Sequence, residues 1–182
     1  MYFGIIWRLV YLALALGLFV LGFYAGTVIQ ISKEQAEIIK SELREKNQNL
    51  GGLGIFVNNA IPGLEMFIPG AGIGIGTYAS FSTGQVLNAF SVDNPALKRI
   101  SPLSLLISPF ALLEIFAYAI GMSRSGMLVY YLIRKRKTLK QSWKKFIIPT
   151  IIEIGIVIVI LFIGSVVEWQ ALAQRTAAVA NS

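Results

Sequence analysis

Few side chains in this sequence are able to do chemistry, and most of them lie inside long apolar stretches. The chain has no cysteine and no histidine, which removes thiol nucleophiles, Cys/His metal sites and imidazole acid–base catalysis. A charge at the centre of a bilayer costs about 2.5–3.5 kcal/mol on insertion scales, so charged residues there usually face a bundle interior and pair. The candidate intramembrane polar site consists of Asn58, Asn59, Glu65, Glu114, Arg124 and Glu153.

Two interpretations of this polar set remain open. In the first, its members line a route or site for an ion or a substrate. In the second, they are neutral or paired groups that hold a kinked bundle together. Glu114 has two candidate partners, the guanidinium of Arg124 and the amides of Asn58 and Asn59. No catalytic residue, cofactor or metal site is predicted, because cysteine and histidine are absent and the lysines that Ser/Lys chemistry would need all lie outside the apolar runs.

The elements that carry these residues are predicted to be membrane-spanning helices. Of the 182 residues 55% are hydrophobic, and the mean hydropathy is +0.69. Apolar runs longer than about 18 residues form helices in lipid, because the backbone must satisfy its own hydrogen bonds there. We predict an all-α, polytopic transmembrane helix bundle, a single domain over 1–182 with about five spans. The spans cover about 5–31, 53–68, 71–90, 102–133 and 147–167.

Two of these spans are not expected to be straight. The segment 53–68 contains Asn58-Asn59 and Pro62-Gly63, which favour a kinked or discontinuous helix, and Pro69-Gly70 then predicts a hinge. The run 102–133 is too long for one straight span, and we expect a break near Gly121–Gly126. A signal peptide is the alternative for the first run, but the apolar core of such peptides is only about 7–15 residues long.

Small and polar residues recur every four positions in the third span, so they share one helix face. This spacing predicts a small-xxx-small seam for close helix packing. The predicted seam consists of Gly72, Gly76, Ser80, Gly84 and Asn88.

Two hydrophilic segments connect the spans. The segment 32–50 reads as a short amphipathic helix outside the membrane, and Ser32 with Gln35 fits a capping box at its start. The segment 134–146 has seven basic residues and no acid, which predicts a position at the lipid headgroups. The predicted headgroup contacts are Arg134, Lys135, Arg136, Lys137, Lys140, Trp143, Lys144 and Lys145.

The basic segment also predicts the orientation. Short cytoplasmic loops are enriched in Lys and Arg, so 134–146 is expected in the cytoplasm of a multi-pass cell-membrane protein. Counting back over five spans places the N-terminus in the cytoplasm as well, unless 53–68 re-enters without crossing. The formal charge of +7 is explained by this topology, and no nucleic-acid partner is predicted, because the aromatic residues lie inside apolar runs.

Several short stretches resemble the stage II sporulation protein M family of integral membrane proteins. They are the apolar-then-Asn-Asn stretch 55–59, the stretch 84–88, and a Pro-x-x-x-x-Glu motif over 109–114. The resemblance also includes the small residues of 117–126 and Glu168 after the last span. Where the family has Pro-His-Gly-x-x-Glu, this chain has Phe110 and Ala111 in place of the histidine and glycine.

The resemblance implies a membrane component of a larger machine, and no catalytic activity follows from it. In spore formers the namesake belongs to a machine that includes peptidoglycan hydrolases, and relatives also occur in organisms that do not sporulate. We therefore expect a non-enzymatic scaffold or assembly subunit, forming a homo-oligomer or joining other membrane subunits in the lipid bilayer. A transporter or channel-like subunit with its polar site at broken helices is the alternative. An intramembrane enzyme is the third possibility, and it would need Ser/Lys or paired-acid chemistry.

Overall fold

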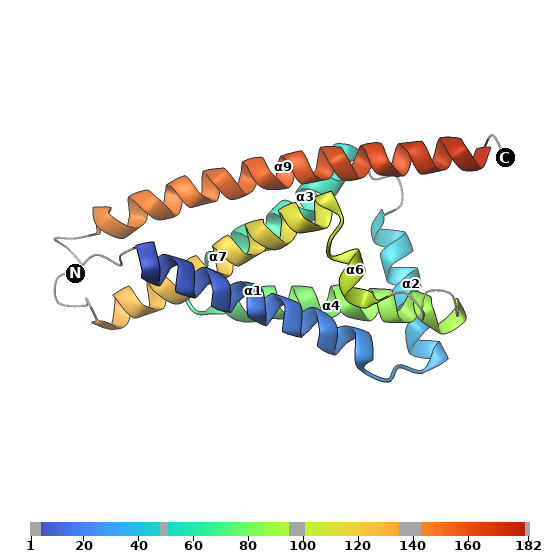
Figure 1. Cartoon of the computed structure of the whole chain (residues 1–182), viewed down its shortest axis with the longest axis horizontal. Helices are drawn as coiled ribbons and strands as arrows, with labels where there is room; N and C mark the ends of the chain where they lie inside the picture. Colours follow the sequence, from blue (N-terminus) through green and yellow to red (C-terminus); the bar gives the residue numbers. More distant parts are fainter. Residues whose placement is uncertain (1–4, 48–50, 95–100, 135–142, 181–182) are drawn as a thin grey trace.

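The computed structural model describes residues 5–47, 51–94, 101–134 and 143–180, and these residues are helical with short turns between them (Figure 1). The helices are α1 (Ile5–Val28), α2 (Lys33–Asn47), α3 (Gly52–Glu65), α4 (Ala71–Asp93), α6 (Pro102–Leu105), α7 (Pro109–Arg134) and α9 (Lys144–Ala180). The described part of the chain contains no strand. The predicted all-α class is therefore confirmed.

Three helices are long and apolar enough to cross a membrane: α1, α7 and the Lys144–Gln174 part of α9. Helix α4 has 23 residues but is rich in glycine and polar residues. Helix α3 has 14 residues and rises only about 21 Å, less than the thickness of a bilayer core. The prediction of about five spans is thus only roughly supported: there are three clear spans, and a helical pair, α3 and α4, packs against them.

Helices α3 and α4 form a hairpin, and the turn between them lies at the predicted hinge. Pro62 lies inside α3, and the chain leaves this helix through Met66 and Phe67, which are both buried. Gly70 then adopts a φ of 79°, a left-handed conformation that favours glycine. The turn is held against α7, because the Ser125 hydroxyl donates a hydrogen bond to the carbonyl oxygen of Ile68 at 2.6 Å.

The expected break of the fourth run near Gly121–Gly126 is wrong. Helix α7 is continuous through this stretch, and the run is interrupted earlier, at the turn 106–108 between α6 and α7. Residues 121–125 are all buried. A Cβ added to Gly121 would lie 2.9 Å from the Cβ of Met66, so the small residues allow close packing and do not break the helix.

The residues of the predicted seam on α4 contact three different neighbours. An added Cβ would meet the carbonyl oxygen of Met66 at Gly72, and the Met122 side chain at Gly76. Ser80, Gly84 and Asn88 face α1 instead. Gly84 lies against the backbone of Phe23, and the Asn88 amide donates to the carbonyl oxygen of Ile29 at 2.6 Å. Helix α4 therefore packs closely on α7 at Gly76 and on α1 at Gly84.

Helix α2 begins with the predicted capping box and packs on α4. The Ser32 N–H donates to the side-chain oxygen of Gln35 at 2.9 Å, and the Gln35 N–H donates to the Ser32 hydroxyl at 3.1 Å. Lys40 is buried although it lies on a hydrophilic helix. Its ammonium bonds Glu37 on the same helix at 2.9 Å and Asp93 at the end of α4.

The bundle has two distinct ends (Figure 1). The first residues of α1, the last residues of α7 and the first residues of α9 lie at one end, which we name the basic end. Helix α2 and the C-terminal part of α9 lie at the other. Every site described below belongs to one of these two ends.

Candidate functional site

A cleft of about 640 Å³ lies between α3, α4, α7 and α9, next to α2. Asparagine, glutamate, serine, threonine and tyrosine side chains contribute its polar lining. These are Asn58, Asn59, Glu65, Tyr78, Ser82, Thr83, Glu114, Tyr118 and Glu168. Among the residues that the structure describes, no Lys or Arg lines the cleft, so the charged groups of this described lining are carboxyl groups.

Glu114 of α7 is the central group of the cleft, and α3 holds it. The side-chain amide of Asn59 donates a hydrogen bond to one oxygen of Glu114. Next to them, the buried Tyr118 hydroxyl donates to the backbone oxygen of Asn59 at 3.3 Å. Asn59 was one of the two partners expected for Glu114, and Arg124, the other, is bonded elsewhere.

Four of the six residues in the predicted polar site line this cleft: Asn58, Asn59, Glu65 and Glu114. Glu65 is exposed at the end of α3. Five further polar residues line the cleft and were missing from the predicted polar site: Tyr78, Ser82, Thr83, Tyr118 and Glu168. Tyr118 follows Glu114 by four residues, one helical turn, so helix geometry alone could have nominated it.

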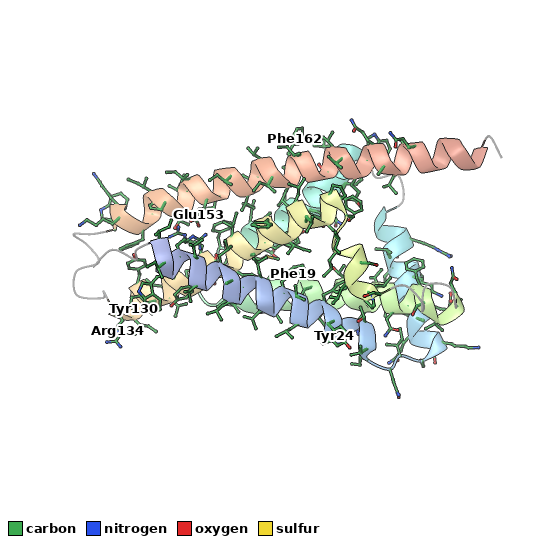
Figure 2. All side chains as sticks on the ribbon, viewed as in Figure 1. Phe19, Tyr24, Tyr130, Arg134, Glu153 and Phe162 are labelled. Atoms are coloured by element: carbon green, nitrogen blue, oxygen red, sulfur yellow. The ribbon has the colours of Figure 1, made fainter. Side chains whose placement is uncertain are left out.

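Arg124 and Glu153, the other two predicted residues, form a separate charged cluster with Arg8. Arg124 donates to Glu153 through both Nε, at 2.7 Å, and Nη2. Arg8 of α1 reaches the same carboxylate at 2.9 Å. Its other terminal nitrogen donates to the Ser123 hydroxyl at 2.6 Å. In Figure 2 the Glu153 side chain lies on the side of α9 that faces α1.

This ionic cluster, Arg8, Ser123, Arg124 and Glu153, connects the three clear spans to one another. The expected alternative of a Glu114–Arg124 pair is therefore wrong. The carboxylate that Arg124 uses comes from α9 and lies 29 residues further along the chain. Arg8 was missing from the predicted polar site, because a lone arginine near the start of an apolar run is also typical of an interface residue whose charged end reaches the headgroups.

The predicted headgroup contacts are described only in part. Arg134, Trp143, Lys144 and Lys145 are exposed at the basic end, and the Lys144 ammonium lies 5.8 Å from the centre of the Trp143 ring. Phe146 is buried there and stacks on Tyr131 at 5.0 Å. The remaining predicted contacts, Lys135, Arg136, Lys137 and Lys140, lie outside the described residues.

The described lining of the cleft is suited to binding cationic or polar groups. Carboxylate, amide and hydroxyl oxygens accept hydrogen bonds from cationic or polar groups. Among the described ranges, no three acidic, histidine or cysteine side chains converge closely enough to hold a metal ion. That the protein is not an enzyme and needs no cofactor stays a prediction.

Comparisons with known proteins identify the family. A search of curated proteins and a search of solved structures each returned no match. The family model described as stage II sporulation protein M matches residues 12–169, from α1 to the middle of α9. This range covers most of the chain, including the cleft residues on α3 and α7 and the ionic cluster residues of α7 and α9. The chain therefore belongs to the stage II sporulation protein M family.

Proposed function

We propose that this protein is a non-enzymatic scaffold or assembly subunit of a membrane complex. Family membership and the three apolar spans support a membrane protein of this family. The observation that carries the scaffold role is the clamp between α2 and α4, by which we mean the ion pair of Lys40 with Asp93. A hydrophilic helix is held in place through the buried Lys40 and Asp93, while Glu34, Glu42 and Arg44 remain exposed on it. A helix held rigidly in this way offers a partner a preformed polar surface.

Co-purification from native membranes tests this role. The chain is tagged at its C-terminus, extracted gently and analysed by mass spectrometry for bound proteins and for particle mass. We expect a stoichiometric membrane partner with the wild type and a several-fold lower yield of it with Lys40→Met, which releases α2. Lys145→Met, which removes an exposed lysine at the basic end, is the matched control and keeps the partner. A particle that contains this chain alone, with nothing bound, contradicts a role in a hetero-complex.

A transporter or channel-like subunit is the second candidate, and the cleft is the observation that favours it. Polar groups on short or interrupted helices are typical of transporter binding sites. Flux of cations or solutes into proteoliposomes tests this alternative. Here Glu114→Gln abolishes transport, whereas Glu34→Gln on the exposed face of α2 leaves it unchanged. Absence of flux with every solute tested leaves the cleft without a transport role.

A further inference from the structure

The ionic cluster at the basic end carries an excess of positive charge. Arg8 and Arg124 both bond Oε2 of Glu153, so two guanidinium groups share one carboxylate. The cluster lies between three membrane-spanning helices, where an uncompensated charge is costly. Its net charge of +1 therefore calls for one more anionic group.

One terminal nitrogen of the Arg124 guanidinium group is also unused as a hydrogen-bond donor. An arginine has five N–H donors. Arg124 uses Nε and Nη2 on Glu153, and its Nη1 has no partner among the described residues. Arg124 as a residue is only 5% exposed, but Nη1 is not among the fully buried atoms that lack a partner, so a ligand can reach this donor.

The cluster is accessible from the side at which anionic lipid headgroups are expected. The Arg8 side chain is 19% exposed, and Arg8 lies in the first turn of α1. Arg134, Lys144 and Lys145 are exposed at the same end of the bundle. Guanidinium groups bind phosphate through paired hydrogen bonds, and anionic phospholipids are enriched in the cytoplasmic leaflet, where the basic end is predicted to lie.

We infer that Arg8 and Arg124 form a binding site for a phosphate group, supplied by the headgroup of an anionic phospholipid. Glu153 positions the two guanidinium groups, and Ser123 fixes the Arg8 side chain from the other side. This site is separate from the cleft and does not depend on the scaffold role.

Native mass spectrometry tests the site, using the full chain released from nanodiscs. The discs contain phosphatidylcholine alone, or an equal mixture with phosphatidylglycerol. We expect the wild type to retain phosphatidylglycerol about fivefold over phosphatidylcholine, as one arginine near an anionic leaflet provides. Arg8→Gln abolishes this preference, and Arg8→Lys, which keeps the charge but loses the paired donors, retains an intermediate one.

Lys144→Gln is the matched control, because it removes one positive charge at the same end but outside the cluster. An equal loss of preference in Lys144→Gln and Arg8→Gln means general attraction to the anionic surface and overturns the site. The same holds if the wild type shows no preference. Inorganic phosphate added to phosphatidylcholine discs separates the two sources of the group. If free phosphate raises the unfolding temperature of the wild type and phosphatidylglycerol does not, the lipid assignment is wrong.

Discussion

Glu114 and Glu153 are both carboxyl groups in apolar helices, but their neighbours give them different roles. Glu114 accepts a hydrogen bond from a neutral amide and lines a cleft. Glu153 is shared by two guanidinium groups from different helices. The hydrogen bond from Asn59 survives the loss of the negative charge of Glu114, whereas the two ion pairs of Glu153 do not survive the loss of its charge.

Substitution by glutamine is expected to separate these two residues. Glu114→Gln keeps the oxygen that accepts from Asn59, so the free energy of unfolding changes by less than about 1 kcal/mol. Glu153→Gln leaves Arg8 and Arg124 without a counter-charge and costs about 3–5 kcal/mol, as breaking a buried pair does. Reversible unfolding in mixed micelles measures both. Equal losses of stability in the two variants contradict this assignment.

The polar residues could be predicted from the sequence, but most of their pairings could not. A charge or an Asn-Asn pair inside an apolar run stands out whatever the fold, so Asn59, Glu114, Arg124 and Glu153 were all identified. Their partners depend on how the helices are arranged. Arg8 bonds Ser123 across 115 residues, and no local spacing predicts such a contact.

At the scale of the helix, the contact between α1 and α4 depends on glycine at some positions and tolerates larger residues at others. Gly26 lies so close to α4 that an added Cβ would be 2.1 Å from the carbonyl oxygen of Phe81. Gly17, on the same helix, has no atom within 4 Å of that position.

The same substitution should therefore have opposite effects at these two sites. Gly17→Ala stabilises α1 by up to about 1 kcal/mol, because alanine favours the helix more than glycine does. Gly26→Ala forces two backbones apart and destabilises the protein by about 1–3 kcal/mol, as overpacking does. Thermal unfolding in detergent compares the two variants. A stabilised Gly26→Ala would show that the close approach of α1 and α4 is absent in the membrane.

Docking of α2 on α4 is expected to depend on pH. The hydrogen bond from Lys40 lowers the pKa of Asp93 below its ordinary 3.8, and the bond to Asp93 raises the pKa of Lys40 above 10.5. The contribution of Asp93 is present above pH 3.8 and is lost as the pH falls through its lowered pKa. The contribution of Lys40 is complete below pH 10.5 and is lost as the pH rises through its raised pKa.

Spin labels measure this docking directly, because the chain has no native cysteine. With labels at Glu45→Cys and Phe90→Cys, we expect one narrow distance distribution between about pH 4 and pH 10. It broadens at both extremes, where α2 leaves α4. Adding Lys40→Met broadens the distribution at every pH. A distribution that Lys40→Met leaves equally narrow at pH 7 argues against the clamp.

The helix boundaries show where sequence patterns mislead. Glycine and serine at 121–126 were interpreted as a break, since both weaken isolated helices. In the bundle they allow α7 to pack closely on the turn after α3, and this packing outweighs their low helix propensity. The seam on α4 was detectable because its four-residue spacing is a local property, although which neighbour each member contacts is not.

At the scale of the whole molecule, the arrangement of the helices predicts the sidedness of the protein. Helix α2 and the basic end lie at opposite ends of the bundle (Figure 1). A single cysteine at Ser41 should therefore react with an impermeant maleimide added to intact cells, and one at Lys145 only in inverted vesicles. Labelling of both positions from the same side contradicts this topology.

The length of helix α9 determines the position of any domain that is fused to its C-terminal end. Its 37 residues rise about 55 Å, roughly 25 Å more than the hydrocarbon core of a bilayer. With its first turn at the basic end, the helix emerges on the opposite side as a stiff rod. The length of α9 therefore sets the height above the membrane of a domain fused at Ala180, and removing one turn lowers this domain by about 5 Å.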